Sequence, residues 1–481
     1  MTNEKFSSLN ICAESKRAIA EVLKFETMTH VQATCIGPIQ KGLDCLAKSK
    51  TGTGKTLAFL IPAVESIRNQ PKAHVSILVL SPTRELANQI ATEARALLTF
   101  HAGSKVVVFV GGTNVNADKR AISGAVTVLV ATPGRLIDHL QSTPGFANSL
   151  ANIKVLVMDE ADRLLDMGFK PAIDQILRSL PPKGNRQTLL FSATIPPAVV
   201  TIARNALRPG YATIDTTGLA EDDSGSTHLH VHQEIVVAPF DQFIYAVAAA
   251  LTEQMNNSPD GYKILVFFTT ARVTGYMAEL FAAAGLNIVE MHSRKSQSYR
   301  EKASEKFRAG KNILMFSSDV TARGLDYPGV TFVLQVGITD KEQYIHRLGR
   351  TARAGKEGKG MIILSDFEER HMTRELKDLP LHRVALERLR PSMDLCRAHF
   401  TTVLVNTQRN PEFIRSAEQA YIAWLGFYNS HLRKIGFDKP VLVQMANQFA
   451  QAVMQLAQQP AIQKKTVGKM GLKGVPGLRL E

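Results

Sequence analysis

Short apolar runs alternate with amphipathic segments along the first three quarters of the chain. Five runs precede residue 215, and five more lie between residues 264 and 364. Continuous apolar runs of this length are typical of strands buried on both faces, and the segments between them, such as 84–99, have helical spacing. The alternation predicts an α/β fold of parallel sheets flanked by helices, with strands at 75–80, 105–110, 126–131, 155–158, 188–191, 264–268, 288–291, 313–316, 332–336 and 361–364.

A polar, acidic stretch with Gly and Ser interrupts the alternation at residues 215–226. Such composition is typical of a linker. We therefore expect two α/β units of the same class, residues 1–214 and 228–368, joined by a linker over 215–227. A ligand held between two such units can control their closure.

Strand-like runs stop after about residue 370. Asn410 followed by Pro favours a helix start, and apolar residues then recur every three to four positions from 413 to 435. A second helix is expected from Pro440, with Pro460 stopping it. We expect this part to divide into a helical extension and an irregular, basic, Gly-rich tail, residues 369–463 and 464–481.

Charge adds a candidate partner to this picture. The 481 residues carry a net charge of +14, and residues 371–481 hold 16 basic against 8 acidic side chains. This excess favours a polyanionic partner, and a C-terminal module specialised for phosphate backbones would have this composition. No apolar run approaches the roughly 18 residues that a membrane span needs, so we predict no membrane partner.

The four cysteines, at positions 12, 35, 45 and 396, form no CxxC pair. Neither a zinc ribbon nor a disulfide framework is indicated, and a reducing, intracellular environment fits this usage. The first residues show no apolar or Arg/Ser-rich targeting pattern. His228, His230 and His232 alternate along an expected strand, but no Cys or carboxylate cluster accompanies them, so they do not predict a metal site.

Two segments carry the chemistry of a triphosphate site. Residues 49–56 form a glycine-rich turn that ends in Lys55 and Thr56, and the strand at 155–158 ends in Asp159 and Glu160. Backbone N–H groups of such a turn cradle phosphates, and the lysine neutralises their charge. Thr56 and Asp159 can hold Mg²⁺, largely through water, which leaves Glu160 to activate a water molecule.

With these two segments, further motifs fall into the order of the DEAD-box RNA helicases, and the chain resembles that family over roughly residues 5–368. The motifs are residues 82–87, Gly111-Gly112, residues 132–135, residues 159–162, Ser192-Ala193-Thr194, residues 322–326 and residues 346–353. The resemblance implies two tandem RecA-like domains and RNA-stimulated ATP hydrolysis.

The resemblance implies an ATP site with Mg²⁺. Phe25 would stack on adenine, and Gln32, which lies 23 residues before Lys55, would read its edge and select ATP over GTP. In this segment Lys24 stands where the family usually has Gly. The implied ATP-binding residues are Phe25, Gln32, Thr51, Gly52, Thr53, Gly54, Lys55, Thr56 and, at the ribose, Asp326. The implied catalytic residues are Lys55, Asp159, Glu160, His346 and the arginine fingers Arg350 and Arg353.

The resemblance also implies that the protein binds single-stranded RNA, through backbone and 2′-OH contacts with little base specificity. Ser192 and Thr194 would relay the state of the phosphates to the RNA side. The implied RNA contacts are Arg84, Gly112, Thr132, Gly134, Arg135, Gln297, Arg300, Ser318, Asp319 and Gly324. The C-terminal part resembles the extension of a subgroup that includes organellar RNA chaperones, and we expect a monomer.

Our hypothesis is an ATP-dependent RNA helicase with RNA-chaperone character. Three alternatives share part of the pattern: an ATP-gated RNA clamp with little unwinding, a translocating DNA helicase of the same superfamily, and a basic RNA-binding protein with an inactive ATP site. Gln32 and Asp162 argue against the DNA enzyme. The intact Lys55, Glu160 and Arg350 argue against an inactive site.

Overall fold

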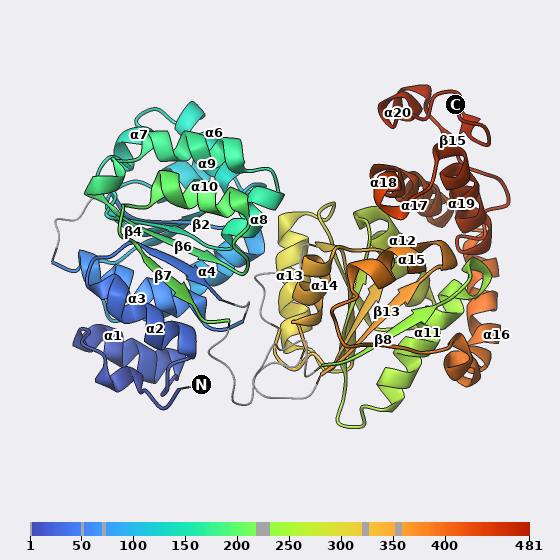
Figure 1. Ribbon diagram of the computed structural model, residues 1–481, viewed down its shortest axis with the longest axis horizontal. Helices are drawn as coiled ribbons and strands as arrows, with labels where there is room; N and C mark the ends of the chain where they lie inside the picture. The colour runs from blue at the N-terminus through green and yellow to red at the C-terminus, as the bar shows by residue number, and fades with distance from the viewer. Residues whose placement is uncertain (1, 50–51, 70–73, 218–230, 320–326, 352–357) are drawn as a thin grey trace. The chain divides into compact units, whose positions relative to one another are not determined.

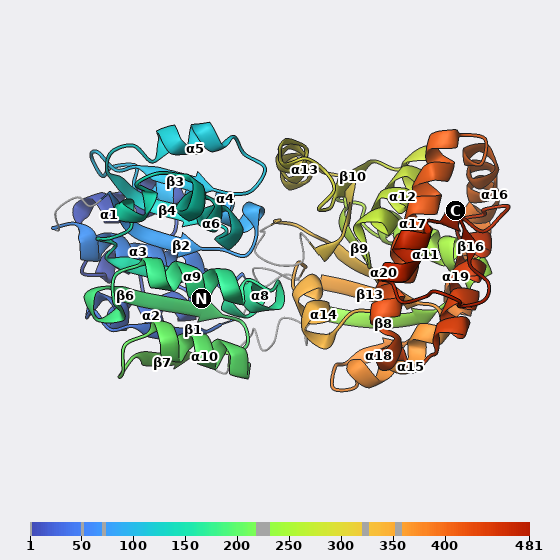
Figure 2. The ribbon, with the colours of Figure 1, turned by 90° about the horizontal axis from the view of Figure 1, so that it is seen from above.

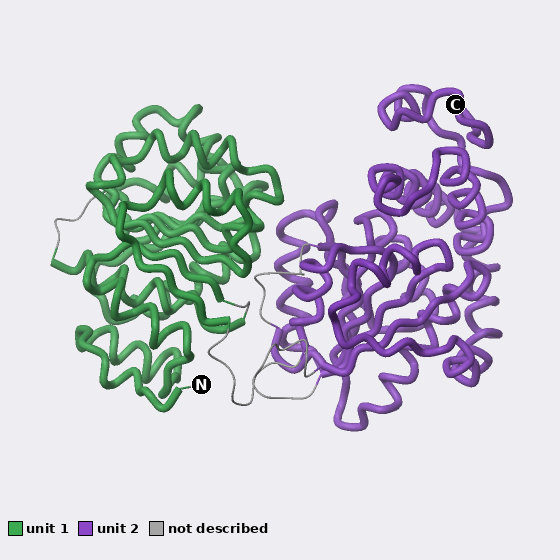
Figure 3. The backbone as a smooth tube through the Cα atoms, viewed as in Figure 1, with its two compact units in different colours: residues 1–225 green, residues 226–481 purple. Residues whose placement is uncertain are grey.

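A computed structural model of the chain describes residues 2–49, 52–69, 74–217, 231–319, 327–351 and 358–481. The chain divides into two compact units, residues 1–225 and 226–481, shown in green and purple in Figure 3. The division falls within the predicted linker, most of which lies outside the described residues.

The first unit is built on a seven-stranded parallel sheet in the order β3-β4-β2-β5-β6-β1-β7. All five predicted strands of this unit are present, and β1 and β7 are additional. The bounds are β1 Cys45–Lys48, β2 Val75–Leu80, β3 Val106–Phe109, β4 Val126–Ala131, β5 Val155–Met158, β6 Gln187–Ser192 and β7 Ala212–Asp215.

Helices cover both faces of the first sheet (Figure 1), and alternate strand residues enter two separate cores. Ile77 and Val79 of β2 pack with α2, α3 and α4, whereas Leu78 and Leu80 pack with α6, α9 and α10. This arrangement explains why most positions of the central strands are apolar on both faces. The helices are α1 Ala13–Arg17, α2 His30–Gln40, α3 Lys55–Ile67, α4 Arg84–Leu97, α5 Val115–Ala121, α6 Pro133–Ser142, α7 Phe146–Ser149, α8 Ala161–Asp166, α9 Lys170–Ser179 and α10 Pro197–Ala206.

The second unit repeats this plan with the parallel order β10-β11-β9-β12-β13-β8-β14. Its strands are β8 Val231–Val237, β9 Lys263–Phe268, β10 Ile288–Met291, β11 Ile313–Ser317, β12 Phe332–Val336, β13 Gly358–Leu364 and β14 Leu381–Arg383. Its helices are α11 Phe240–Asn256, α12 Ala271–Ala283, α13 Gln297–Ala309, α14 Lys341–Leu348 and α15 Asp366–Glu375. The two RecA-like sheets therefore confirm the predicted fold class.

The helical extension packs directly on the second sheet's helices and shares one continuous core with them, from Val231 to Leu472. Its helices are α16 Arg390–Thr407, α17 Pro411–Ser430, α18 Leu432–Ile435, α19 Lys439–Ala452 and α20 Lys464–Lys469, with a short strand pair β15 Ala461–Ile462 and β16 Arg479–Leu480. Phe413, Ala417, Tyr421, Trp424 and Tyr428 are buried along one face of α17, as their spacing predicts.

Three expectations for this C-terminal part are wrong. Strands do not stop at residue 370, because β14 pairs with β8. The second helix ends at Ala452, eight residues before Pro460. The tail is not irregular, since it forms α20 and buries Val467 and Leu472 against the extension.

Candidate nucleotide and RNA site

The glycine-rich turn lies between β1 and the N-terminus of α3. Gly52 and Gly54 have φ values of 77° and 85°, a left-handed conformation that favours glycine. Lys55 and Thr56 are the first residues of α3, both are buried, and the Lys55 ammonium donates a 3.2 Å hydrogen bond to the Ser49 carbonyl. The turn thus presents a helix N-terminus beside a fixed cation, which is a phosphate-binding arrangement. Thr51 lies outside the described residues.

Gln32 connects the predicted adenine-reading segment to this turn. Its side-chain Nε2 donates a 3.0 Å hydrogen bond to the Gly54 carbonyl, and its Oε1 accepts a 2.8 Å hydrogen bond from Thr29 N in the capping box of α2. A Cβ placed on Gly54 would lie 2.5 Å from Nε2 and would displace the amide, and the left-handed φ of 85° also favours glycine. Phe25 is 47% exposed, which leaves its ring available for stacking.

Asp159 and Glu160 follow β5 directly and are both buried. The Glu160 N–H donates a 2.9 Å hydrogen bond to Asp159 Oδ1, and Glu160 has the left-handed φ of 48°. Burial raises the pKa of Asp159 to about 7, Lys55 opposes the rise, and Glu160 adds to it. Buried carboxylates this close together are a poor arrangement unless a cation joins them.

Asp162 joins the acidic segment to the end of β6. Its Oδ2 accepts hydrogen bonds of 3.0 Å from both the N–H and the hydroxyl of Thr194, and its own N–H donates 3.1 Å to the Ser192 hydroxyl. The acidic segment and the predicted relay residues Ser192 and Thr194 are therefore held together by three hydrogen bonds.

The order of strands separates two groups of predicted residues along the carboxyl edge of the first sheet. The ATP-related segments follow β5, β6 and β1, which are neighbours, and the RNA-related segments follow β3, β4 and β2, which are also neighbours. Figure 2 shows β3 and β4 toward one end of this sheet and β1 and β7 toward the other. Ligands of parallel α/β sheets bind at this edge.

The RNA-related residues of the first unit lie mostly at the starts of helices. Arg84 begins α4, and a Cβ on Gly111 would lie 2.9 Å from its Nη2, so the guanidinium rests against that glycine turn. Gly112 and Gly134 are exposed, and Thr132 is the residue directly before α6, with no capping hydrogen bond from its side chain.

Arg135 differs from the expectation of a surface contact. It is 8% exposed, and its guanidinium pairs with Asp118 at 2.7 Å and donates 2.9 Å to the Thr113 carbonyl. His139 Nε2 lies 3.2 Å from the same carboxylate. The sequence gave no signal for Asp118, because it belongs to none of the quoted motifs.

In the second unit, too, the predicted RNA contacts follow neighbouring strands. Gln297 and Arg300 begin α13 after β10 and are buried, with a 3.4 Å hydrogen bond from Arg300 Nη1 to Gln297 Oε1. Ser318 and Asp319 follow the neighbouring β11. Gly324 and Asp326 lie outside the described residues.

The arginine segment begins on α14, after β12. His346 Nε2 lies 3.7 Å from Glu342 Oε1, and Arg350 is 2% exposed and donates 3.2 Å from Nε to the His346 carbonyl. Arg347, which had no role assigned from sequence, donates 3.1 Å from Nε to Asp319. Its position within the motif at residues 346–353 is the sequence feature that could have indicated a functional role for Arg347. Arg353 lies outside the described residues.

Two further expectations concern membranes and metals. Across the described ranges, no helix combines the length and the apolar character that crossing a membrane requires. His232 is exposed and stacks on His382 with ring centroids 5.3 Å apart, while His228 and His230 lie outside the described residues.

A phosphate turn follows β1 and an acidic segment follows β5, with β6 between these two strands of one sheet. Together with the repeated RecA-like sheets and the arginine segment of the second unit, they define a two-unit nucleoside triphosphatase. Residues 29–202 match the DEAD/DEAH box helicase family, and residues 246–355 match the helicase conserved C-terminal domain. The chain belongs to the DEAD-box family of ATP-dependent RNA helicases.

Similar proteins include DEAD-box ATP-dependent RNA helicase 25 of Oryza sativa subsp. japonica, which is 44% identical over 488 residues, covering 100% of this chain and 79% of the relative. DEAD-box ATP-dependent RNA helicase 31 of Arabidopsis thaliana is 45% identical, covering 100% of this chain and 66% of the relative. Among solved structures, Mss116p bound to ssRNA and AMP-PNP has a TM-score of 0.82 at 28% identity, covering 98% of this chain and 95% of that one. The protein is thus an ATP-hydrolysing RNA helicase.

Proposed function

We propose that the enzyme separates short RNA duplexes locally and acts as an RNA chaperone. Single-stranded RNA would lie along the β3-β4-β2 edge of the first unit and the β10-β11 edge of the second. ATP would bind at the β5-β6-β1 edge and recruit the arginine segment that follows β12. The division of both sheets into the same two groups of strands carries this proposal. Bending of RNA that spans both units would destabilise an adjacent duplex, and hydrolysis would release the strand.

Each ATP-site residue has a role that its position supports. Phe25 would stack on adenine and Gln32 would read its edge. Lys55 would neutralise the phosphates beside the N–H groups of residues 52–56. Glu160 would take the proton of the attacking water. Arg350, with Arg353, would stabilise the charge of the transition state, a contribution worth roughly 10³–10⁵ in rate. His346 would link the arginine segment to residues 159–162.

The residues present fit a Mg²⁺ ion. The Thr56 hydroxyl and the Asp159 carboxylate are oxygen donors of the kind that Mg²⁺ prefers. Among the described residues, Glu160 Oε2 is buried without a hydrogen bond, and its ion-pair partner Arg163 Nη1 lies 3.6 Å away. Burial raises the pKa of Asp159 to about 7 and Lys55 opposes that rise, so a cation bound at this carboxylate would favour its charged form. When bound, Mg²⁺ would neutralise charge that develops on the β- and γ-phosphate oxygens.

The hydrogen bonds of Asp162 support a coupling role for Ser192 and Thr194. A shift of residues 159–162 on hydrolysis would move the end of β6, because three hydrogen bonds join the two segments. Arg84, Gly112, Thr132 and Gly134 would then change their grip on the RNA backbone. Arg135 would contact the RNA from beside the turn at Thr113, whose carbonyl accepts a hydrogen bond from its guanidinium.

In the second unit Ser318 and Asp319, with Gly324, would contact the RNA backbone, and Gln297 and Arg300 would support them from α13. Because backbone contacts carry little base information, we expect little sequence preference and action as a monomer.

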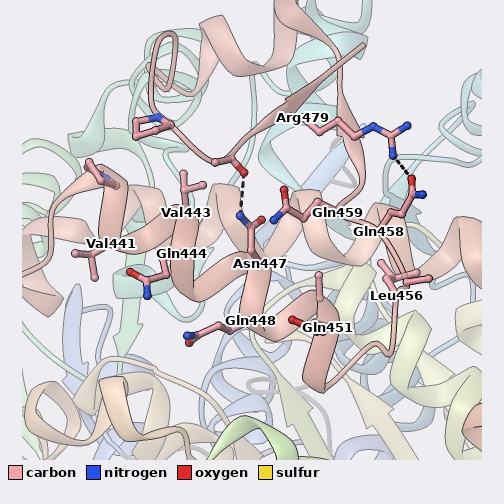
Figure 4. A pocket seen from close by; sticks show the side chains of 15 residues that line it. Val441, Val443, Gln444, Asn447, Gln448, Gln451, Leu456, Gln458, Gln459 and Arg479 are labelled. Carbon is pink, nitrogen blue, oxygen red and sulfur yellow. Dashed lines mark hydrogen bonds between the residues drawn. The ribbon is translucent and has the colours of Figure 1, made fainter.

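The chaperone activity would come from the C-terminal part of the chain, since residues 371–481 hold 16 basic against 8 acidic side chains. The surface of the extension has a hollow of about 850 Å³ along α19 (Figure 4). Its lining combines apolar residues such as Val441 and Leu456 with amide side chains such as Gln444 and Gln448 and the cation Arg479. The lining contains no carboxylate, which suits a polyanion nearby.

Hydrolysis of ATP by the purified chain without nucleic acid, with single-stranded RNA and with matched DNA tests the proposal. RNA alone should stimulate turnover strongly. Stimulation by DNA would favour the DNA helicase, and no stimulation by either polymer would contradict the mechanism. A duplex substrate separates the unwinder from the alternative, an ATP-gated clamp that assembles a complex with little unwinding.

Glu160→Gln tests the assigned base. It should lower hydrolysis by about 10²-fold or more and trap ATP-bound RNA complexes that survive competitor RNA. Glu21→Gln, which changes an exposed residue of an i,i+4 ion pair with Arg17, is the matched control and should behave like wild type. Ordinary multiple turnover by Glu160→Gln would refute the mechanism.

A further inference from the structure

A buried hydroxyl group of the helical extension is hydrogen-bonded to helix α15 of the second RecA-like domain. Tyr428 on α17 donates a hydrogen bond to Oε1 of Glu368 on α15, and both residues are buried. Figure 1 places α17 and α18 over α15. Other polar contacts also join the extension to this domain, such as the Tyr276 hydroxyl with the Val453 carbonyl, but the Tyr428 hydroxyl is bonded to a buried carboxyl group of α15.

Glu368 is fixed by donors from several directions. Its Oε2 accepts 2.7 Å from the Ser365 N–H and 2.8 Å from the Ser365 hydroxyl, which closes the capping box of α15. Burial raises the pKa of Glu368, and hydrogen bonds from Tyr428, Ser365 and the Ile338 backbone oppose that rise. The carboxyl group therefore ties α17, the start of α15 and the turn at Ile338 together.

That turn passes directly against the Tyr428–Glu368 pair. Gly337 has a φ of 89°, and a Cβ placed there would lie 3.1 Å from the Tyr428 hydroxyl and 3.4 Å from Glu368 Oε1. The same Cβ would lie 2.7 Å from Thr269 Cγ2, so the space for this turn is set by side chains on two sides. Displacing the hydroxyl would change where the turn rests.

The turn leads straight into α14, the helix that carries His346 and Arg347 and ends just before Arg350. Helix α15 holds the start of α14 at two further points: Thr339 N donates to Met372 Sδ at 3.5 Å, and Lys341 N donates to Glu375 Oε1 at 3.2 Å. The beginning of α14 is thus set by α15, and α15 is set in part by Tyr428.

We infer that Tyr428 of the helical extension is a positioning residue for ATP hydrolysis, acting through Glu368 and the Gly337–Ile338 turn on α14 and Arg350. The inference rests on the role proposed above for Arg350. It assigns to the extension an effect on turnover that is separate from its charge and from RNA binding.

Tyr428→Phe is a suitable test because the ring itself is held by aromatic neighbours. Trp424 and Phe367 lie 4.2 and 5.2 Å from it between centroids, so phenylalanine keeps this packing and removes only the hydroxyl. The matched control is Tyr421→Phe. Tyr421 lies on the same helix, and its hydroxyl donates 2.8 Å to Asn447 Oδ1 within the extension, away from α15.

RNA-stimulated ATP hydrolysis, the RNA dissociation constant and the unfolding midpoint should be measured for both variants. We expect both to lose some thermal stability, but only Tyr428→Phe to lower kcat, by about tenfold, because small displacements of a catalytic group are costly. KM for ATP and the RNA dissociation constant should stay within about twofold of wild type. An unchanged kcat in folded Tyr428→Phe overturns the inference.

The double variant Tyr428→Phe/Glu368→Gln separates positioning from stability. Tyr428→Phe leaves the buried Glu368 carboxyl group with one hydrogen-bond donor fewer. Replacing that carboxyl group by a neutral amide removes this destabilising group, so the unfolding midpoint should recover while kcat stays low. Recovery of kcat together with the midpoint would show a purely structural role. Arg350→Ala is measured alongside: if it retains turnover, the proposed arginine role fails, whereas an inactive Arg350→Ala with normal Tyr428→Phe refutes only the role of Tyr428.

Discussion

Arg347 Nε donates a 3.1 Å hydrogen bond to the Asp319 carboxylate, which joins α14 to the residues that follow β11. The Arg347 side chain is 3% exposed, and its guanidinium carbon lies 5.2 Å from the centroid of the Phe267 ring. The RNA-related and ATP-related segments of the second unit thus share one ion pair. Asp162 and Thr194 provide the corresponding link in the first unit.

Replacing Arg347 by lysine should weaken this link. A lysine cannot donate from several nitrogens in a fixed plane while covering the Phe267 ring, so Asp319 and α14 would lose their fixed relation. We expect RNA-stimulated hydrolysis to fall about tenfold, with basal hydrolysis nearly unchanged. Steady-state kinetics with and without RNA measure the ratio of RNA-stimulated to basal hydrolysis.

The control for that change is Arg308→Lys. Arg308 Nη1 lies 3.3 Å from Glu305 Oε2 in an exposed pair on α13, and such pairs contribute little. Equal loss of RNA stimulation in both variants would show that the effect is not specific to the Asp319 pair.

Thr194→Val should uncouple hydrolysis from unwinding. Valine keeps the shape and the backbone N–H bond to Asp162 but loses the 3.0 Å hydroxyl bond. Because the ATP-binding residues are untouched, hydrolysis should stay within about twofold while duplex separation falls about tenfold. Strand release from a labelled duplex gives the second quantity. Thr213→Val, on exposed β7, should change neither, and a parallel fall of both activities in Thr194→Val would argue against a relay.

Gln32→Glu should weaken ATP binding without altering the fold of α2. The carboxylate cannot donate to the Gly54 carbonyl as the amide does at 3.0 Å, nor can it donate to adenine, and it adds negative charge near the phosphates. We expect KM for ATP to rise about tenfold or more, together with a weaker preference over GTP. Gln40→Glu is the matched control, because Gln40 lies on the same helix and donates 3.1 Å to the Asn10 carbonyl in an exposed position. An unaltered KM in Gln32→Glu would remove Gln32 from the nucleotide site.

Lys24→Gly should stabilise the first unit. Lys24 ends the preceding helical segment with φ 58° and ψ 40°, where a residue with a Cβ is strained by about 1–2 kcal/mol. Part of that gain is offset by the greater freedom of glycine in the unfolded chain, which leaves about 0.5–1 kcal/mol. Calorimetric unfolding measures it. Lys41→Gly, at φ −73°, should give no gain, and a destabilised Lys24→Gly would show that the lysine side chain makes a favourable contact.

Strands buried on both faces are predictable because nearly every residue in them is apolar. Val75–Leu80 was placed at its observed bounds for this reason. Leu381–Arg383 was missed because it is a three-residue edge strand with two exposed side chains, so its pattern has no apolar run. Helix α16 was missed for a similar reason: Leu395 is 81% exposed, and its buried residues are widely spaced.

The site was predictable as a set of motifs, but the bonds within it were not. Gly54 has a left-handed φ of 85° and lies close to the Gln32 side chain. A glycine at this place in the motif already indicates a backbone position of that kind. The pairing of Arg135 with Asp118 depends on α5 and α6 lying together, and nothing in the spacing of 17 residues indicates it. The bond between Tyr428 and Glu368 spans 60 residues and two structural elements, and only the packed core shows it.

The core that the second unit shares with the extension affects how the chain folds during synthesis. The first sheet is complete once Asp215 has left the ribosome, so that unit can fold while synthesis continues. The second unit cannot complete its core until Leu472 emerges, about a hundred residues after the end of β13. Until then, the apolar faces of α11 and α12 that pack on the extension stay uncovered. We therefore expect the second unit to expose apolar helix faces for longer during synthesis than the first unit does.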